Sequence, residues 1–285
     1  MSYSTTRRET YRVAIQGGIA SFHDLAVREY FKDQSIELLP CKTFKQVCNA
    51  VVHGDSDYGV MAIENSLAGS LLPNYGLLEN HPLQIIGEQY LRISHNLMAL
   101  PGQTVQDIKI VKSHPMALAQ SSEFFEKYSH LEPLETDDTA ESAREIALNQ
   151  VRGVAAVASA LAAELFNLDI LEAGIENLKQ NYTRFFVIAP KKIKIKTGGQ
   201  KASLNFRISH QVGSLAGILE IFKKFNINLT LIQSVPVPGY PDEYSFHIDL
   251  EWTIEEDFLR ALEAMREKSQ AVSLLGVYKK GVKPY

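Results

Sequence analysis

The segment at residues 190–201 divides the chain into two parts with different sequence patterns. It contains five lysines and the pair Gly198-Gly199 but few large apolar side chains. This composition is typical of a linker between folded units. We therefore expect one domain over residues 11–190, a linker over residues 191–201 and a second domain over residues 202–285.

Strand-like and helix-like stretches alternate throughout residues 11–190. The stretches 11–16 and 58–63 are apolar enough to be buried strands, and each stops at a polar turn that a helix-like stretch follows. The same succession recurs at residues 108–111 and 153–158. Such alternation predicts an α/β fold with parallel strands.

We expect the first domain to consist of two α/β lobes with a cleft between them. Residues 11–90 together with a last strand at residues 183–190 would form one lobe, and residues 91–180 would form the other. Because the chain would cross between the lobes twice, the expected architecture is similar to that of periplasmic binding proteins.

The second domain shows the order strand, helix, strand, strand, helix, strand. The strands are expected at residues 202–208, 229–235, 244–250 and 272–278, and the helices at residues 215–225 and 258–265. This order predicts a ferredoxin-like βαββαβ fold. Because a sheet of this kind keeps open edges, we expect it to pair with a second copy in a homodimer or homotetramer.

Composition and motifs exclude several classes of protein. The formal net charge of −4 gives no basic surface for nucleic acid. Cys41 and Cys48 form no zinc or disulfide pattern, and the sequence contains no HExxH, GxGxxG or phosphate-binding loop motif, so we expect neither a metal nor a cofactor. The start of the chain, MSYSTTRRETYR, has no apolar run, and no stretch is long enough to span a membrane. We therefore expect a cytoplasmic protein without membrane contact.

Four polar turns lie at the ends of predicted strands or the starts of predicted helices. They are Glu64-Asn65-Ser66 with Gly69-Ser70, Ser113-His114-Pro115, Asp137-Asp138-Thr139 and Asn181-Tyr182-Thr183-Arg184. Each turn alone is explained as well by turn formation and helix capping. Together they predict a site for a small anionic ligand, because such ligands bind beyond the ends of strands and at helix N-termini. We expect Asp138 to cap the helix at residues 140–149, with Glu141 placed for a capping box.

Several separated stretches of the first domain resemble prephenate dehydratases, in the same order along the chain. They are VAIQGG near the start, MAIENSLAGSLL at residues 61–72, KSHPMALAQ at 112–120, DDTAESA at 137–143, VASALAA at 157–163 and NYTRFFVIA at 181–189. The last stretch holds the Thr-Arg-Phe signature of that family. The second domain resembles an ACT domain, because GSLAGIL at residues 213–219 is similar to the effector motif of those domains.

The resemblance implies a decarboxylating dehydration that converts prephenate to phenylpyruvate, carbon dioxide and water, with L-phenylalanine as a feedback inhibitor that binds the ACT domain. Aromatisation drives this reaction, which agrees with the expectation of no cofactor. The motifs fit arogenate dehydratase equally well, since arogenate carries an amino group where prephenate has a ketone. A third interpretation is a non-catalytic, two-lobed ligand-binding protein with a regulatory function.

By the same resemblance, Thr183 is the catalytic residue and donates a hydrogen bond toward the departing hydroxyl, with a water or Glu64 behind it. Judged without the family, Thr183 is an ordinary β-branched strand residue. The implied substrate-binding residues are Glu64, Asn65, Ser66, Ser70, Ser113, His114, Gln120, Thr139, Asn181, Arg184 and Phe185. If the chain is extended at Thr183, Arg184 faces the opposite side and anchors the lobes.

The implied effector-binding residues lie around the first helix of the ACT domain. They are His210, Val212, Gly213, Ser214, Leu215, Gln233 and Ser234. Gly213 would let the loop approach the backbone of an amino acid closely. Two stretches depart from the family pattern: Gln233-Ser234-Val235-Pro236 stands where Glu-Ser-Arg-Pro is usual, and His23 stands where a serine is usual. These departures leave open how the effector signal is transmitted and what the first turn contributes to substrate binding.

Overall fold

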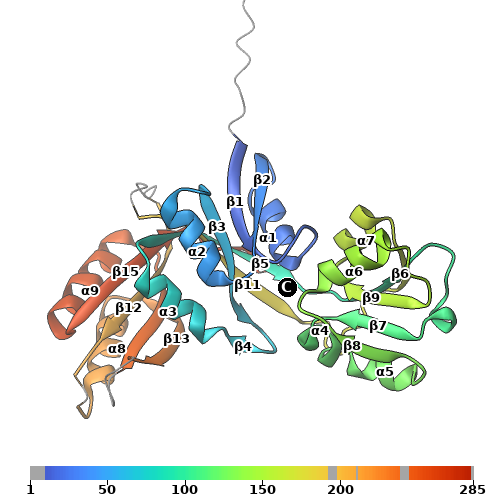
Figure 1. The fold of residues 1–285 in the computed structure, drawn as a ribbon. Coiled ribbons are helices and arrows are strands. Elements are labelled where there is room, and N and C mark those ends of the chain that lie inside the picture. The colour runs from blue at the N-terminus through green and yellow to red at the C-terminus, as the bar shows by residue number, and fades with distance from the viewer. Residues whose placement is uncertain (1–9, 192–197, 210, 238–243, 284–285) are drawn as a thin grey trace, which may run out of the picture.

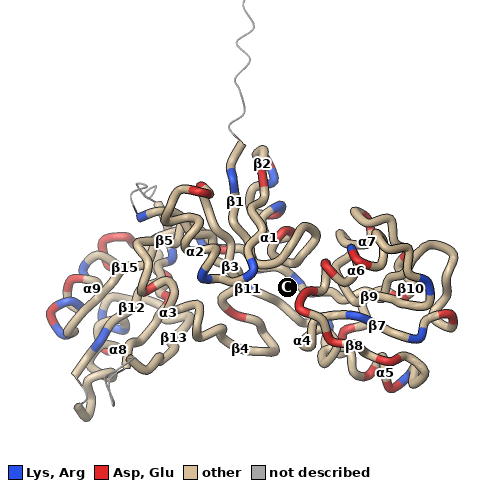
Figure 2. The backbone as a smooth tube through the Cα atoms, in the orientation of Figure 1, with Lys and Arg blue, Asp and Glu red and all other residues tan. Residues whose placement is uncertain are grey.

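The computed structural model describes residues 10–191, 198–209, 211–237 and 244–283, whose strands form three sheets (Figure 1). The chain before the linker builds two sheets, one in each lobe, and the chain after it builds the third. The first lobe lies in the middle of the molecule, with the second lobe and the C-terminal sheet on opposite sides of it (Figure 1). Basic and acidic residues are spread over all three parts (Figure 2).

The sheet of the first lobe holds the strand that carries the Thr-Arg-Phe motif. Its order is β2 (Ser35–Cys41), β1 (Thr10–Gln16), β3 (Tyr58–Asn65), β11 (Tyr182–Pro190) and β5 (Leu83–Arg92), with the short β4 (Gly69–Ser70) paired to β3. Strand β1 is parallel to β2 and β3, whereas β11 is antiparallel to both of its neighbours, β3 and β5. The motif therefore lies inside the sheet and not at its edge.

Helices cover both faces of this sheet. Helix α1 (Phe22–Tyr30) packs on one face, where Phe185 and Val187 of β11 point. Helices α2 (Phe44–His53) and α3 (Leu72–Asn80) pack on the other face, together with Phe186 and Ile188. Because successive side chains of a strand point to opposite faces, β11 contributes to both cores.

The second lobe is built on a five-stranded sheet. Its order is β10 (Asp169–Glu172), β6 (Asn96–Ala99), β9 (Val154–Ala158), β7 (Ile110–Ser113) and β8 (Glu132–Glu135). The helical segments are a 3-10 turn (Val105–Asp107), α4 (Pro115–Ala119), α5 (Ser122–Lys127), α6 (Thr139–Leu148) and α7 (Ala160–Phe166). Alanines and small aliphatic residues dominate the core between α6, α7 and β9, which allows the helices to approach the sheet closely.

The chain crosses between the lobes twice, as the sequence predicted. It leaves the first lobe after β5, enters the second at β6, and returns after β10 into β11. The predicted parallel strands are present in the pairs β1–β2, β1–β3, β7–β8 and β7–β9. Both sheets are mixed, because β11 in the first lobe and β6 in the second are antiparallel to their neighbours. Strand β11 enters the first lobe from the opposite end because the chain comes back from the second lobe.

The C-terminal part has the predicted ferredoxin-like arrangement. Its antiparallel sheet has the order β13 (Asn228–Pro236), β14 (Tyr244–Glu251), β12 (Lys201–Arg207) and β15 (Ala271–Tyr278). Helices α8 (Ser214–Lys224) and α9 (Glu255–Lys268) bury their apolar stripes against this sheet, around Phe206, Phe222 and Phe258. The first strand of this unit along the chain, β12, lies inside the sheet. It pairs with the last strand, β15, which forms one edge.

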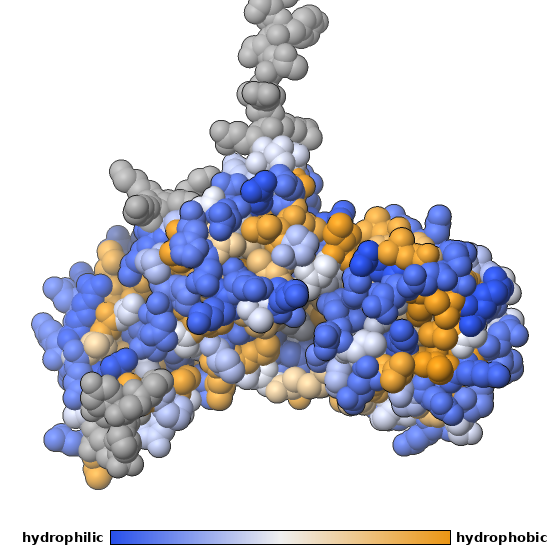
Figure 3. Space-filling model, in the orientation of Figure 1, coloured by the Kyte–Doolittle hydropathy of each residue, from blue (hydrophilic) through white to orange (hydrophobic). Residues whose placement is uncertain are grey.

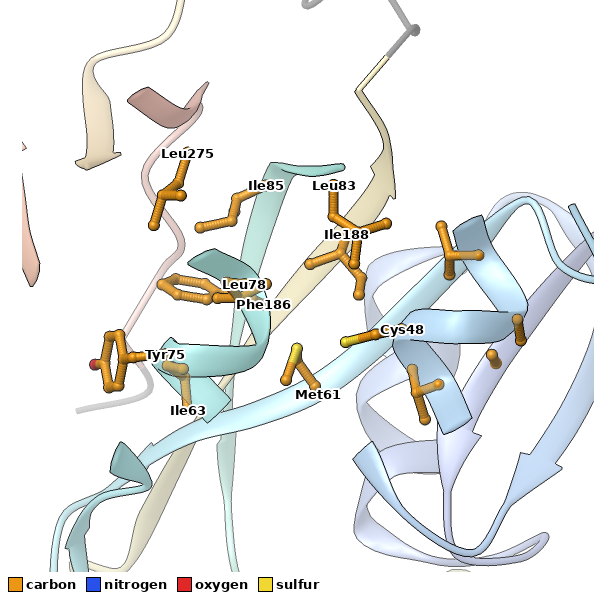
Figure 4. Packing of buried hydrophobic residues seen from close by; sticks show 14 of the residues in the cluster. Cys48, Met61, Ile63, Tyr75, Leu78, Leu83, Ile85, Phe186, Ile188 and Leu275 are labelled. Atoms are coloured by element: carbon orange, nitrogen blue, oxygen red, sulfur yellow. The ribbon is translucent and has the colours of Figure 1, made fainter. Parts of the chain in front are cut away.

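Strand β15, at one edge of the C-terminal sheet, packs against β5 of the first lobe. Figure 4 shows Leu275 of β15 beside Ile85 of β5 and the ring of Phe186 of β11. The backbones come closest at Gly276, where an added Cβ would lie 2.1 Å from the carbonyl oxygen of Ile85. Glycine is thus required here by the close approach of two strands and not by its backbone angles.

A buried group of charged side chains ties β11 to the C-terminal sheet. Arg184 is 3% exposed, and its Nε donates to Glu88 Oε2 at 2.7 Å. Its Nη1 donates to Asp249 of β14, and its Nη2 donates to the hydroxyl of Tyr278 at 3.2 Å. Burial alone would raise the pKa of Glu88, but Arg184 and the buried Lys201 lower it below its usual range. The sequence predicted that Arg184 would point away from Thr183 and anchor the two lobes. The direction is confirmed, but the anchor joins the first lobe to the C-terminal sheet.

The close contact at Gly276 leads to a stability prediction. Gly276→Ala should lower the free energy of unfolding by about 1–3 kcal/mol, because the added methyl group must push β15 away from β5. Gly217→Ala in α8 is the matched control, since the nearest atom to an added Cβ there is the Lys268 ammonium nitrogen at 3.9 Å. The control should be neutral or stabilising. Urea unfolding of the three proteins tests this, and equal stability of both variants would show that the strands are not in contact.

Candidate functional site

A cleft of about 430 Å³ lies between the two lobes. The first lobe contributes Gln16, Ser21, Phe22, His23, Phe44, Ala62, Asn65, Ala68, Leu71, Thr183 and Phe185, and the second lobe with its connections contributes Ile93, His95, His114, Met116, Ala117, Gln120, Asp137, Asp138 and Thr139. The molecular surface is hollowed between the lobes (Figure 3). The cleft can therefore enclose a small molecule between aromatic walls and polar turns.

Helices from both lobes begin at this cleft. Ser21 caps α1 by accepting from the backbone N–H of Asp24 at 3.3 Å. Asp138 caps α6 by accepting from the backbone N–H of Glu141 at 2.8 Å, so the predicted cap is confirmed. The side chain of Glu141 binds Arg144 and completes no capping box. The N-terminal ends of two helices in opposite lobes thus lie at the same cleft, where the carboxylates of Asp137 and Asp138 oppose the partial positive charge of α6.

The hydroxyl of Thr183 is held by the side chain of Asn65. The Oδ1 atom of Asn65 accepts from the backbone N–H groups of Leu67 at 3.0 Å and Ala68 at 2.9 Å, which fixes the orientation of the amide. Its Nδ2 group therefore donates to Thr183 Oγ1 at 2.9 Å and to Asn181 Oδ1 at 2.8 Å. Because the threonine oxygen already accepts a hydrogen bond, its own proton is free to point into the cleft.

Further hydrogen bonds extend this arrangement into the second lobe. Asn181 Nδ2 donates to Gln120 Oε1 at 2.9 Å, and His95 Nε2 lies 3.0 Å from the same oxygen. Because that oxygen accepts, the His95 proton must be on Nε2. Burial lowers the pKa of His95, although Gln120 and Glu176 oppose this effect. A continuous polar network thus runs from the second lobe across the connection to Thr183.

His23 stands on the apolar wall of the cleft. Its ring packs against those of Phe44 and Phe185, with centroid distances of 5.4 and 5.1 Å. Its Nε2 accepts a hydrogen bond from the backbone N–H of Ala62 at 3.3 Å. Burial lowers the pKa of His23 to about 4, so the imidazole is neutral at neutral pH. The sequence singled out His23 as a departure from the family pattern but gave it no place in the site.

Most residues of the predicted substrate site meet at the cleft. Asn65, His114, Gln120, Thr139, Thr183 and Phe185 line it, and the buried Asn181 lies directly behind Asn65. These residues come from β3, β11, α6, the two caps of α4 and the connections between the lobes, so only the folded chain brings them together. Asn181 and Gln120, 61 residues apart in sequence, and Asn65 and Thr183, 118 residues apart, come within hydrogen-bond distance here because both lobes end their strands at the same cleft.

Five predicted substrate residues lie elsewhere. Glu64, Ser66 and Arg184 line a separate polar cavity of about 400 Å³ between the first lobe and the C-terminal sheet. Ser113 is buried and its hydroxyl donates to the carbonyl of Val157 at 2.6 Å. Ser70 belongs to the short β4 and does not line the cleft. The prediction of cleft contacts for these residues is therefore corrected: strand alternation turns the first group to the far face, and Ser113 serves the second lobe's sheet.

The predicted effector residues are only partly assembled. Ser214 and Leu215 line a cavity of about 120 Å³ together with Ile208, Ser209, Gln211, Tyr244 and Phe246. Gly213 begins α8 with φ +84°, a conformation that favours glycine. Val212 is fully exposed, and Gln233 and Ser234 lie on β13 opposite His247 and Phe246, outside this cavity. His210 lies outside the described residues.

Sequence reasoning missed several residues of the cleft. His95 follows β5 without any pattern around it, and Phe44 and Met116 read as ordinary apolar residues. Phe22 could have been found, because it follows the first strand and turn where other cleft residues are expected. In the part of the chain that the structure describes, no group of three or more His, Cys, Asp or Glu side chains could hold a metal ion. Likewise, none of the described helices has the length and apolar character of a membrane span.

Comparisons with known proteins agree with this geometry. Residues 13–193 match the family model described as prephenate dehydratase. A bifunctional chorismate mutase/prephenate dehydratase of Aquifex aeolicus is 35% identical over 273 residues, which cover 95% of this chain and 74% of that protein. Arogenate dehydratase 5 of Arabidopsis thaliana is 34% identical over 304 residues, which cover 100% of this chain and 71% of that protein.

Two solved structures share the fold over most of their length. The structure titled GqqA, a novel type of quorum quenching acylase, has a TM-score of 0.85 and 33% identity, covering 94% of this chain and 97% of that one. A prephenate dehydratase from Arthrobacter aurescens in complex with L-Phe has a TM-score of 0.82 and 25% identity, covering 94% of this chain and 90% of that one. The similarity therefore includes the C-terminal sheet as well as the two lobes.

Proposed function

Because the chain belongs to the prephenate dehydratase family, we propose that it converts prephenate to phenylpyruvate, carbon dioxide and water. The single observation that carries the proposal is the hydroxyl of Thr183, which receives a hydrogen bond from Asn65 at 2.9 Å and can direct its own proton into the cleft. Such a donor is what the departure of a hydroxyl group requires.

The reaction breaks two bonds of prephenate and creates an aromatic ring. The electrons of the bond to the ring carboxylate enter the ring as carbon dioxide leaves, and the C4 hydroxyl departs with its bonding pair. Thr183 stabilises the charge that develops on this oxygen by a hydrogen bond, and one proton taken up from the solvent turns the departing hydroxide into the product water. The helix N-terminus at Ser21 in the first lobe supplies partial positive charge for the substrate's carboxylates, away from the acidic cap of α6 at Asp138. The aromatic residues Phe22, Phe44 and Phe185 provide the apolar walls for its ring.

The same arrangement serves arogenate, which undergoes the same bond changes. Arogenate differs by an ammonium group on the side chain, and a relative of similar identity is named an arogenate dehydratase. Purified protein should be offered both substrates in parallel, with ultraviolet detection of phenylpyruvate and chromatographic detection of phenylalanine. If neither compound is turned over, the proposal of a dehydratase fails, and the interpretation as a non-catalytic ligand-binding protein remains.

Dehydration fits the site better than the acylase chemistry named for one of the similar structures. A threonine that acts as a nucleophile needs a neighbouring base that accepts its proton. Here the neighbour of the Thr183 hydroxyl is the Nδ2 group of Asn65, which is a donor. The hydroxyl is thereby arranged to give a hydrogen bond and not to lose its proton.

The role of Thr183 leads to a kinetic prediction. Thr183→Val keeps the β-branched shape and removes the hydroxyl, so kcat should fall by at least about 10²-fold. Thr183→Ser keeps the donor and is the matched control, which should retain most of the activity. Steady-state rates with prephenate, and thermal unfolding to confirm that all three proteins are folded, provide the measurement. A folded valine variant with normal kcat would rule out Thr183 as the donor.

We further propose that residues 202–285 form an ACT domain that binds L-phenylalanine and lowers the activity of the cleft in a homodimer or homotetramer. The cavity beside Ser214 and Leu215 supports this proposal, because it opens at the N-terminus of α8, where N–H groups can receive a carboxylate. A similar structure was solved in complex with L-Phe. Tyr244 and Phe246 add aromatic surface to the same cavity.

The effector proposal predicts a variant that is active but insensitive. Gly213→Val should abolish inhibition by L-phenylalanine, because valine is strained at φ +84° and its side chain would enter the open space beside the cavity. Uninhibited turnover should stay within about threefold of the original, since the two sites are separate. Gly217→Ala in the same helix is the control and should keep its inhibition. Calorimetry with L-phenylalanine completes the test, and equal binding to the valine variant would place the effector elsewhere.

A further inference from the structure

Strand β3 contains a bulge next to the catalytic threonine. Along β11, Thr183 pairs with Asn65 and Arg184 pairs with Glu64, but Phe185 pairs with Ala62. Ile63 therefore has no paired residue on β11. At this point β3 has one residue more than β11, which defines a β-bulge. The bulge is thus located between the apolar part of the strand and the polar turn that follows it.

The bulge decides which side chains reach the cleft. Ala62 and Asn65 both line it although they are three positions apart, whereas a regular strand would place them on opposite faces. Glu64 instead lines the polar cavity on the far side. Without the extra residue, Asn65 would turn away from the cleft and Thr183 would lose the donor that orients its hydroxyl.

Groups outside the ladder hold the bulged segment in place. The carbonyl of Ile63 accepts from the backbone N–H of Leu71 at 2.9 Å, and the carbonyl of Ala62 accepts from Asn74 Nδ2 at 2.7 Å. The N–H group of Ala62 donates to His23 Nε2 at 3.3 Å. Strand β1 pairs with β3 only as far as Val60, so His23, on the helix that follows β1, provides an acceptor beyond the end of that pairing.

The position of His23 is itself well determined. Its ring lies between Phe44 and Phe185, and the cap at Ser21 fixes the start of the helix that carries it. Because Nε2 accepts a hydrogen bond, the ring proton is on Nδ1. A buried backbone N–H that loses its acceptor costs free energy, so removing the imidazole would favour a different path of the strand at Ala62.

We propose that His23 is a positioning residue for the dehydration: it holds the bulge in β3 and thereby keeps Asn65 in contact with Thr183. This inference rests on the proposed function of Thr183. His23 needs no contact with the substrate for this role, since it acts through the backbone of Ala62.

Two substitutions of His23 distinguish the packing of its ring from the hydrogen bond that its Nε2 accepts. His23→Phe keeps an aromatic ring against Phe44 and Phe185 but removes the acceptor, and His23→Gln places an amide oxygen near the position of Nε2. We expect His23→Phe to lower kcat by about tenfold or more, with the Michaelis constant within about threefold, because a small displacement of a catalytic group is costly. We expect His23→Gln to keep kcat within about threefold of the original protein. If His23→Phe does not fold, His23→Leu replaces it in the comparison.

Hydrogen–deuterium exchange tests the structural step without any substrate. The backbone amide hydrogens of β3 should exchange faster in His23→Phe than in the original protein or in His23→Gln. Unchanged exchange in His23→Phe, or faster exchange with an unchanged kcat, would overturn the inference. So would a change confined to the Michaelis constant, which would make His23 a substrate contact. If the original protein turns over neither prephenate nor arogenate, the proposed function fails, while the exchange experiment still decides whether His23 holds the bulge.

Discussion

The alternation of side chains along β11 is the constraint on which the rest of the structure depends. Thr183 and Phe185 point into the cleft, while Arg184 and Phe186 point to the other face of the same sheet. Since β11 lies between β3 and β5, it can move only if both neighbours move with it. Thr183, the proposed catalytic donor, and Arg184, the link to the C-terminal sheet, are thus adjacent residues of one inner strand.

The environment of Arg184 shows how firmly the two units are joined. The guanidinium is buried between Glu88 of the first lobe and Asp249 of the C-terminal sheet, and Lys201 adds a second cation beside Glu88. Each charge is neutralised by another within the interface, whereas loss of one partner from such a group typically costs about 3–5 kcal/mol. Together with the close approach of β15 to β5 at Gly276, this makes the C-terminal sheet a direct neighbour of the strand that carries Thr183.

Local patterns in the sequence predicted those features that depend on local physics. The period of apolar residues predicted β1, β3, β7, β9 and β11 but not β5, β6 or β10. Asp138 was recognisable as a helix cap, and the period of two in an extended chain predicted that Arg184 faces away from Thr183. The bulge at Ile63 could not be predicted, because it depends on partners from β11, α1 and α3 that are distant in sequence. The bulge puts Ala62 and Asn65 on the cleft face of β3 and leaves Glu64 on the other face. His95 was missed for a similar reason, since only the folded chain brings it to Gln120.

The central claim is that Asn65 orients the hydroxyl of Thr183 so that its proton points into the cleft. A double-mutant cycle for kcat with Asn65→Asp and Thr183→Val tests this claim most directly, because Asn65→Asp removes the donor and keeps the acceptor for Leu67 and Ala68. If the two side chains act as one unit, each single variant should be strongly impaired. The double variant should then be within about threefold of Thr183→Val alone. Losses that multiply in the double variant would contradict the account, because they would show that Asn65 and Thr183 act independently.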